Sequence, residues 1–244
     1  MAVSKGSYGK MQIFEHFLGF QTATMGTTLL PLGSQGWNYV SVNEGSFAAT
    51  TDEDGGVLAV TTDTADNDNF FACAGPFKPS NGGVWMEVRL KMADITTDAI
   101  YVGFSETLDA TTPVCPAEYA TATLTVNGTG GMVGMLWDSD GTTDYWMAVA
   151  GNAGVAATGA PVSSVQAAVN DEYDVIRVEI DADGNGECYL AGLDGGFKLI
   201  KRFTTPVTNT DLVYACFGIE NRSGAASTIE VDYANCGSYV DWTR

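Results

Sequence analysis

Apolar and polar residues alternate strictly in three segments of the sequence, Val84–Met92, Tyr173–Asp181 and Ser227–Ala234. Successive side chains of a β-strand point to opposite faces of a sheet, so this alternation predicts strands with one buried and one solvated face. The side chains that we expect on the buried faces are Val84, Met86, Val88, Leu90, Ile176, Val178, Ile180, Ile229, Val231 and Tyr233.

Eight further apolar runs predict strands, because turn-forming sequences separate them. Asp- and Gly-rich segments at Asp138–Gly141, Asp181–Gly186 and Leu193–Gly196 predict tight hairpins, which imply antiparallel pairing. Thr107–Thr123 is predicted to be a long loop, and Val162–Asp171 a short helix or another loop. The eight runs are Gly56–Thr62, Asn69–Ala74, Ala99–Ser105, Met132–Asp138, Asp144–Ala150, Gly186–Ala191, Phe197–Thr204 and Leu212–Glu220.

These elements together predict an all-β protein built as a two-sheet antiparallel β-sandwich. Many strands with almost no helix bury their apolar faces by packing one sheet on another. We expect less than about a tenth helix, against about a third in an average domain. Residues 21–244 would form the β-sandwich domain, and residues 1–20 an N-terminal arm or the first strand.

The charge balance excludes several classes of partner. Thirty Asp and Glu against eleven Lys and Arg give a formal net charge of −19. Such a surface repels the phosphate backbone of nucleic acids and the headgroups of anionic lipids. The sequence has no apolar run of the roughly eighteen residues that a membrane span needs. Its first twenty residues do not resemble a secretory signal. We therefore expect no nucleic-acid or membrane partner, and synthesis in a cytoplasm.

Cysteine and histidine give little support to metal, redox or triad chemistry. The five cysteines are scattered without a C-x-x-C pair, which predicts reduced and mostly buried thiols. His16 is the single histidine, so a site with several histidine ligands is excluded. The same residue is the one histidine that could act as the base of a serine triad, and it lies in the predicted arm. We expect no cofactor and no resident metal.

Two acidic turns leave a calcium site open as an alternative. Asp181-x-Asp183-x-Asn185-Gly186 matches the first half of an EF-hand loop, whose twelfth position supplies a bidentate glutamate. That position is Gly192 here, and strands flank the loop where an EF-hand has helices. A plain hairpin turn is the preferred interpretation, as it is for the similar turn of Asp138–Asp144.

Paired carboxylates raise the question of glycoside hydrolysis. Glycosidases of the concanavalin A-like class have a strand pattern E-x-D-x-x-E. Glu230-Val-Asp232 begins a similar pattern, but Asn235 stands where the second glutamate belongs. Glu179-Ile-Asp181 begins it too and ends in Gly184. We therefore predict outward carboxylates on solvated strands and no hydrolase activity.

Two tryptophans are candidates for a sugar-binding platform. Trp85 and Trp146 each alternate with aliphatic neighbours along a predicted strand, and so point to the opposite face. Burial in a second layer or at an interface is the preferred interpretation, with sugar stacking as the alternative.

A series of short motifs resembles tailed-phage virion proteins that have a concanavalin A-like jelly roll. The first motif is the aromatic–acidic stretch Ile13–Gly19, which ends in F-L-G. The others, in chain order, are Trp37–Val42, Gly55–Thr61, Asp66–Phe71, Trp85–Lys91, Ile100–Phe104, the R-V-E-I-D strand at Arg177–Asp181 and the closing strand Ile229–Tyr233. The resemblance implies a head-surface component, often a capsid decoration protein, and no catalytic residues.

Together these observations predict a non-enzymatic virion structural protein on the outer capsid surface. Its expected partners are the major capsid protein and its own copies, with a trimer as the expected homo-oligomer. The alternative is a carbohydrate-binding module on the virion surface, with glycans as partners. Apolar and basic residues of the N-terminal segment would make the capsid or subunit contact: Lys5, Lys10, Ile13, Phe14, Phe17, Leu18 and Phe20.

Overall fold

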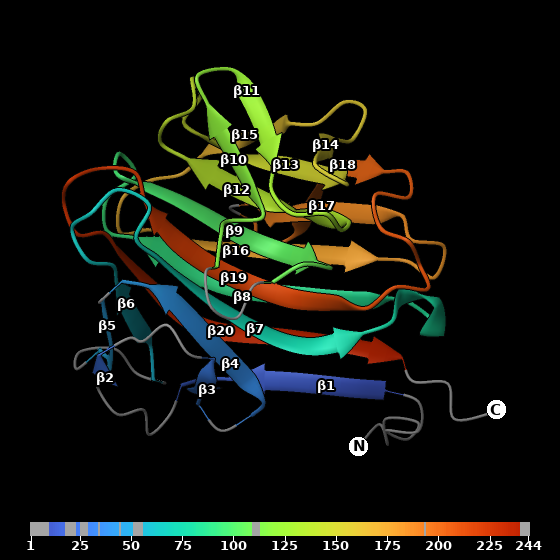
Figure 1. Ribbon diagram of the computed structural model, residues 1–244, viewed down its shortest axis with the longest axis horizontal. Helices are drawn as coiled ribbons and strands as arrows, with labels where there is room; N and C mark the ends of the chain where they lie inside the picture. The colour runs from blue at the N-terminus through green and yellow to red at the C-terminus, as the bar shows by residue number, and fades with distance from the viewer. Residues whose placement is uncertain are drawn as a thin grey trace.

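The protein is a sandwich of two antiparallel sheets, each of nine strands, packed face to face (Figure 1). This computed structural model describes residues 10–17, 23–24, 29–33, 35–43, 45–50, 56–108, 113–192 and 194–239. Within those ranges the one helical element is a 3-10 turn, η1 (Pro79–Asn81). The predicted all-β sandwich is confirmed.

The first sheet, sheet A, contains the three alternating segments as neighbouring strands. It places β16 beside β8 and β8 beside β20. The last strand, β20, has β6 along its first half and β1 along its second half. The order is β18 (Phe197–Phe203), β17 (Gly186–Ala191), β16 (Tyr173–Ile180), β8 (Val84–Met92), β20 (Thr228–Tyr239), β6 (Leu58–Thr61), β5 (Ser46–Ala49) and β2 (Ala23–Thr24), with β1 (Lys10–Glu15) on β20.

The second sheet, sheet B, is buried on both faces along its central strands. Every residue of β9 and of β12 is buried, so these strands show none of the alternation seen in sheet A. The order is β14 (Val155–Ala156), β13 (Tyr145–Asn152), β12 (Met132–Asp138), β9 (Asp98–Ser105), β19 (Val213–Asn221), β7 (Asn69–Phe77), β4 (Trp37–Val42) and β3 (Leu30–Leu32), with β15 (Val162–Ala167) on β13.

Two predicted irregular segments form strands instead. The predicted helix or loop at Val162–Asp171 begins with β15, which pairs with β13 at the edge of sheet B. The predicted loop at Thr107–Thr123 contains β10 (Ala117–Ala120), which forms a separate hairpin with β11 (Thr123–Val126). Both strands are short and lack a clear apolar alternation, so their pairing depends on tertiary contacts.

The main core lies between the two sheets and matches the predicted inward positions with one exception. Val178 in β16 is fully buried, and its neighbours Arg177 and Glu179 point outward. Tyr233 is the exception. A bulge in β20 pairs Val231 with Leu90 but Tyr233 with Arg89, and this shift turns Tyr233 to the outer face.

The next residue along β20 takes the inward position that was predicted for Tyr233. Ala234 is fully buried in the main core, whereas the Tyr233 hydroxyl donates a hydrogen bond to Glu87 Oε1 at 2.7 Å. A one-residue bulge reverses the facing of the residues beyond it, which alternation in the sequence alone does not reveal.

Val178→Asp tests the facing of β16. It would place a carboxylate between the sheets, and we expect the free energy of unfolding to fall by roughly 2–7 kcal/mol in denaturant titrations. Val175→Asp, on the outer face of the same strand, is the matched control and should lower the free energy of unfolding far less. Equal losses for the two variants would contradict the register.

Candidate functional site

The predicted N-terminal contact residues lie partly within the fold. Ile13 is half-buried and packs against the main core, and Phe17 is fully buried in it, so Phe17 is not available to a partner. Phe14 is half-buried and stacks on Tyr233 with ring centroids 5.9 Å apart. Lys5, Leu18 and Phe20 lie outside the described residues, as does the side chain of Lys10.

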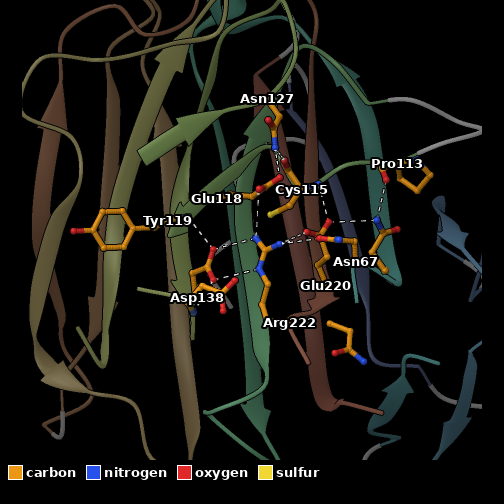
Figure 2. A network of polar contacts seen from close by, with 12 residues as sticks. Asn67, Pro113, Cys115, Glu118, Tyr119, Asn127, Asp138, Glu220 and Arg222 are labelled. Carbon is orange, nitrogen blue, oxygen red and sulfur yellow. Dashed lines mark hydrogen bonds and ion pairs between the residues drawn. The ribbon is translucent and has the colours of Figure 1, made fainter. Parts of the chain in front are cut away.

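A buried ion-pair network lies on the outer side of sheet B, where the β10–β11 hairpin crosses it (Figure 2). Its centre is Arg222, whose side chain is 4% exposed. The guanidinium binds Asp138 through two nitrogens, at 3.3 and 3.1 Å, and Glu220 Oε1 at 2.7 Å. Glu118 of β10 lies 3.9 Å from the same guanidinium.

Burial alone would lower the pKa of Arg222, but the neighbouring carboxylates of Asp138 and Glu220 outweigh that effect and raise it. Burial raises the pKa of Glu220, against the opposing effect of Arg222. The cluster therefore holds a cation, Arg222, in a buried ion pair with Asp138 and Glu220.

The same carboxylates fasten the hairpin segment to the sheet. Asp138 accepts a hydrogen bond from the backbone N–H of Tyr119 at 2.8 Å, and Glu220 accepts one from that of Cys115 at 3.3 Å. Asn127 donates to the carbonyl of Cys115 at 2.9 Å and to Glu118 Oε1 at 2.6 Å. These contacts satisfy the charged groups internally, which is typical of a structural role.

Beneath the hairpin lies a second apolar cluster. It joins hairpin side chains such as Ala117 and Val126 to residues on the outer side of sheet B, including Tyr101, Leu136 and Met147. The hairpin thus covers this part of sheet B and explains why its central strands are buried on both faces.

Most of the other sequence candidates also have structural roles. All five cysteines are free and buried, and burial raises the pKa of Cys73 to about 11, which makes its thiol unreactive. Trp146 is in the main core rather than on an outer face, because the side of β13 that carries it faces sheet A. Its indole N–H donates to Asp174 Oδ2 at 2.8 Å.

Asp181 uses its carboxylate within its own turn and toward Arg202. Asp181 Oδ1 accepts hydrogen bonds from the backbone N–H groups of Asp183 and Asn185, each at 2.9 Å. Its Oδ2 binds Arg202 at 2.9 Å. Burial would raise the pKa of Asp181, but these hydrogen bonds and Arg202 lower it. Across the described part of the chain, no group of three or more His, Cys, Asp or Glu side chains is arranged to hold a metal ion.

Asp98 is a buried acid at the start of β9. It is fully buried, and its Oδ2 has no hydrogen-bond partner among the described residues. Thr97 donates to its Oδ1 at 3.2 Å. Burial, with a smaller effect of the Asp94 charge, raises the pKa of Asp98 to about 8, despite the Thr97 hydrogen bond. Asp98 is therefore largely protonated in the folded protein at neutral pH.

The outer face of sheet A is the broad, partly exposed surface that remains. Side chains from neighbouring strands lie side by side in rows across it. One row runs Gly237, Trp85, Glu179, Glu187 and Arg202, from β20 across to β18. The next row runs Asn235, Glu87, Arg177, Tyr189 and Leu199. Each row therefore places one aromatic ring beside charged side chains.

Ion pairs within and between the rows hold these charged side chains in place. Arg177 binds Glu87 at 3.1 Å and Glu179 at 2.6 Å, and its guanidinium lies 5.0 Å from the centroid of the Trp85 ring. Arg202 binds Asp181 and also Glu187, the latter at 3.2 Å. Planar guanidinium and carboxylate groups are thus fixed beside an indole ring.

An open pocket of about 390 Å³ lies at the Trp85 end of this face. Gly237 leaves room for the indole, since a Cβ at that position would come within 3.0 Å of Trp85. The pocket is lined by Gly82, Gly83, Val84, Trp85, Arg177, Glu179, Ile180, Asp181, Glu187 and Arg202. Sequence reasoning singled out Trp85 but missed its neighbours, which come from strands far apart in the chain.

The predicted incomplete carboxylate patterns are also on this sheet. Glu230 binds Lys91 at 2.9 Å and Asp232 binds Arg89 at 2.5 Å, so neither carboxylate is free. Glu179 and Glu187 lie directly opposite each other on β16 and β17, each paired with an arginine. The face presents fixed hydrogen-bonding groups rather than an unpaired acid and base.

Comparisons with solved structures identify the class of fold. The structure is similar to peanut lectin, with a TM-score of 0.55 at 12% identity over 89% of this chain and 97% of the lectin. The seed lectin of Lotus tetragonolobus gives 0.54 at 10% identity over 91% of this chain and 100% of that chain. A Shewanella oneidensis protein of unknown function, SO2946, gives 0.52 at 12% identity over 97% and 90%.

The sandwich is therefore of the concanavalin A-like type, as predicted. At these identities the likeness shows the fold alone. No family model matches the sequence, and no curated protein matches it. Within the described residues, no helix is long and apolar enough to cross a membrane.

Arg222→Met tests the buried network. Without the cation, Asp138 and Glu220 would be left as uncompensated buried carboxylates, and we expect a loss of about 3–5 kcal/mol in the free energy of unfolding at pH 7. Arg202→Met is the control, because that side chain is 55% exposed and its pairs are worth about 1 kcal/mol or less. Similar losses for both variants would refute a special role for the network.

Asp98→Asn tests the buried acid through pH. The pKa of Asp98 is about 8 in the folded protein, against 3.8 in an unperturbed aspartate. Between these pH values the carboxyl group is protonated in the folded protein and ionised in the unfolded chain, so the free energy of unfolding falls as pH rises. The free energy of unfolding of the variant should not fall in this way, and between pH 4 and pH 8 it should come to exceed that of the parent by on the order of a few kcal/mol. Parallel stability–pH curves from denaturant titrations would contradict the assignment.

Proposed function

We propose that this protein is a non-catalytic carbohydrate-binding module, and that sugars bind on the outer face of sheet A at the Trp85 pocket. The observation that carries the proposal is the arrangement of that pocket. A half-buried indole lies beside two arginines and three carboxylates that are already fixed in ion pairs.

The chemistry of this surface suits a sugar ring. The C–H face of a pyranose packs against an aromatic ring, and its hydroxyls donate to carboxylates and accept from guanidinium groups. Glu179, Glu187 and Arg202 lie in the same cross-strand row as Trp85. Neighbouring strands are about 4.8 Å apart, so a short oligosaccharide that lies across the strands can contact the indole and then these groups in turn. Because the ion pairs hold the groups in place, binding costs little side-chain ordering.

The same ion pairs support a binding role rather than a hydrolytic one. Glycoside hydrolysis uses one protonated and one ionised carboxyl group on either side of the scissile bond. Glu179 and Glu187 are instead each held in an ion pair with an arginine. Neither is therefore placed to protonate a leaving group.

A phage virion role is the second candidate. It is supported by the order of the motifs that resemble virion proteins, and these fall on β1, β4, β6–β9, β16 and β20. In this proposal the protein decorates the outer capsid surface as a homo-oligomer, and the half-buried Phe14 contributes to the contact with the major capsid protein. Mass spectrometry of purified particles tests it, and absence of this chain from them would reject it.

Trp85→Ala tests the carbohydrate site. A glycan array followed by calorimetric titration should find an oligosaccharide that the parent binds, and the substitution should weaken its binding about tenfold, or about 1.4 kcal/mol. Chromatography of the glycan after incubation should show it intact.

Tyr173→Ala is the matched control, because Tyr173 lies on the same outer face beneath Arg89 but does not line the pocket. It should bind as the parent does. Thermal unfolding of both variants verifies that they are folded. Parent protein that binds no glycan at millimolar concentration would refute the proposal, as would equal losses for the two variants.

A further inference from the structure

One edge of the sandwich has features that the proposed site does not explain. Here the last strand of sheet A, β18, lies close to β13 and β15 of sheet B. Figure 1 shows β13, β14, β15 and β18 gathered at one end of the molecule. Two pockets open along this edge, of about 260 and about 520 Å³.

The linings of these pockets contain three cations and no carboxylate, in a chain of net charge −19. Lys198 lines the smaller pocket, and Lys201 and Arg202 line the larger one. Asp194, in the turn before β18, is close to Lys198 but lines neither pocket. Hydroxyl and amide side chains complete the polar lining: Asn152, Thr158, Ser163, Ser164, Gln166, Thr204 and Thr205.

Lys198 and Lys201 differ from the cations on the outer face of sheet A. Arg89, Lys91, Arg177 and Arg202 all have carboxylate partners on the outer face of sheet A. Lys198 and Lys201 have no ion pair with any described residue. They are therefore available to an anionic ligand without the loss of an existing ion pair.

The form of β18 argues against another strand as the occupant. The pairing with β17 shifts between Cys188 and Tyr189, which leaves Ile200 as a bulge. Lysines and bulges on an edge strand oppose edge-to-edge pairing, because they prevent a regular hydrogen-bonded ladder. A polymer that binds through side chains does not need that ladder.

Arg202 connects this edge to the Trp85 pocket. It lines both that pocket and the larger edge pocket. A linear chain of sugars can therefore contact Trp85 and then pass Arg202 to reach Lys201. Exposed aliphatic groups offer apolar contact with sugar rings along the edge, since Leu199 is 52% and Val155 67% exposed.

We propose that the β15–β18 edge extends the carbohydrate site and selects an acidic polysaccharide, whose carboxylate or sulfate groups bind Lys198 and Lys201. The proposal rests on the carbohydrate-binding function proposed above. It adds the substrate class and names the residues that distinguish an acidic chain from a neutral one.

The test compares oligogalacturonate with its methyl-esterified form of the same length, by calorimetry at physiological salt. The parent should bind the acidic form more tightly. The double variant Lys198→Gln, Lys201→Gln should lose about tenfold in affinity for the acidic form and little for the neutral one. Lys78→Gln is the control, because Lys78 lines neither edge pocket nor the Trp85 pocket, and it should change neither affinity.

Each other result has a defined meaning. Equal binding of both forms, unchanged in the double variant but weakened by Trp85→Ala, would overturn this inference and leave the proposed function standing. Binding of neither form would overturn it as well, and failure of the glycan array would separately reject the proposed function. If polyglutamate competed with equal affinity, the edge would be a site for acidic segments in general. If the double variant lost a dimer that the parent forms, a second copy of the protein would be the occupant. Either outcome would reject an acidic polysaccharide as the ligand of this edge.

Discussion

The buried Arg222 cluster is the interaction on which the arrangement of the molecule's two outer faces depends. Its guanidinium joins the end of β12 to β19 and lies near β10, three elements far apart in sequence. A buried ion pair stabilises the fold only when every charged group has enough partners to offset the free-energy cost of its removal from water. Here backbone N–H groups of the hairpin segment are further partners of Asp138 and Glu220. The hairpin can therefore remain closed over sheet B, where it covers a second apolar cluster. That closure leaves the outer face of sheet A as the candidate recognition surface.

On the outer face of sheet A many acidic side chains lie close together. Their carboxylates would repel one another if they had no cations as partners. Cross-strand pairing places Arg89, Lys91 and Arg177 next to acidic side chains, and aromatic rings fill the spaces between them. The result is a partly dehydrated surface whose polar groups have fixed directions. Such a surface is suited to recognise the hydroxyl pattern of a sugar, because its side chains are already ordered in the folded sheet and lose little further entropy on binding.

The sequence predicted the sandwich well where one face of a strand meets water. Alternation identified β8 and β16 and the facing of Val178, since period-two burial follows directly from strand geometry. Alternation predicted the wrong face for Tyr233, because the bulge arises from the pairing of β20 with β8 and cannot be recognised in the sequence of one strand. It also missed the Arg222 network, whose members Asp138 and Arg222 are 84 residues apart. Trp85 was identified as a candidate, but the pocket around it exists only after four strands pair.

A strongly acidic protein can still bind an acidic chain because charge acts locally in salt. At physiological ionic strength the Debye length is about 8 Å, so most of the thirty carboxylates contribute little to the potential at one exposed edge. The local lining determines the potential there, and the polar side chains that line the β15–β18 edge are cations, hydroxyls and amides, without a carboxylate. Arg202 is already neutralised by Asp181 and Glu187, so it connects the two pockets without adding much net attraction. The attraction must then come from Lys198 and Lys201, the cations there without an ion pair to another described residue. Repulsion from the remainder of the surface would at the same time disfavour acidic ligands that cannot reach these two lysines.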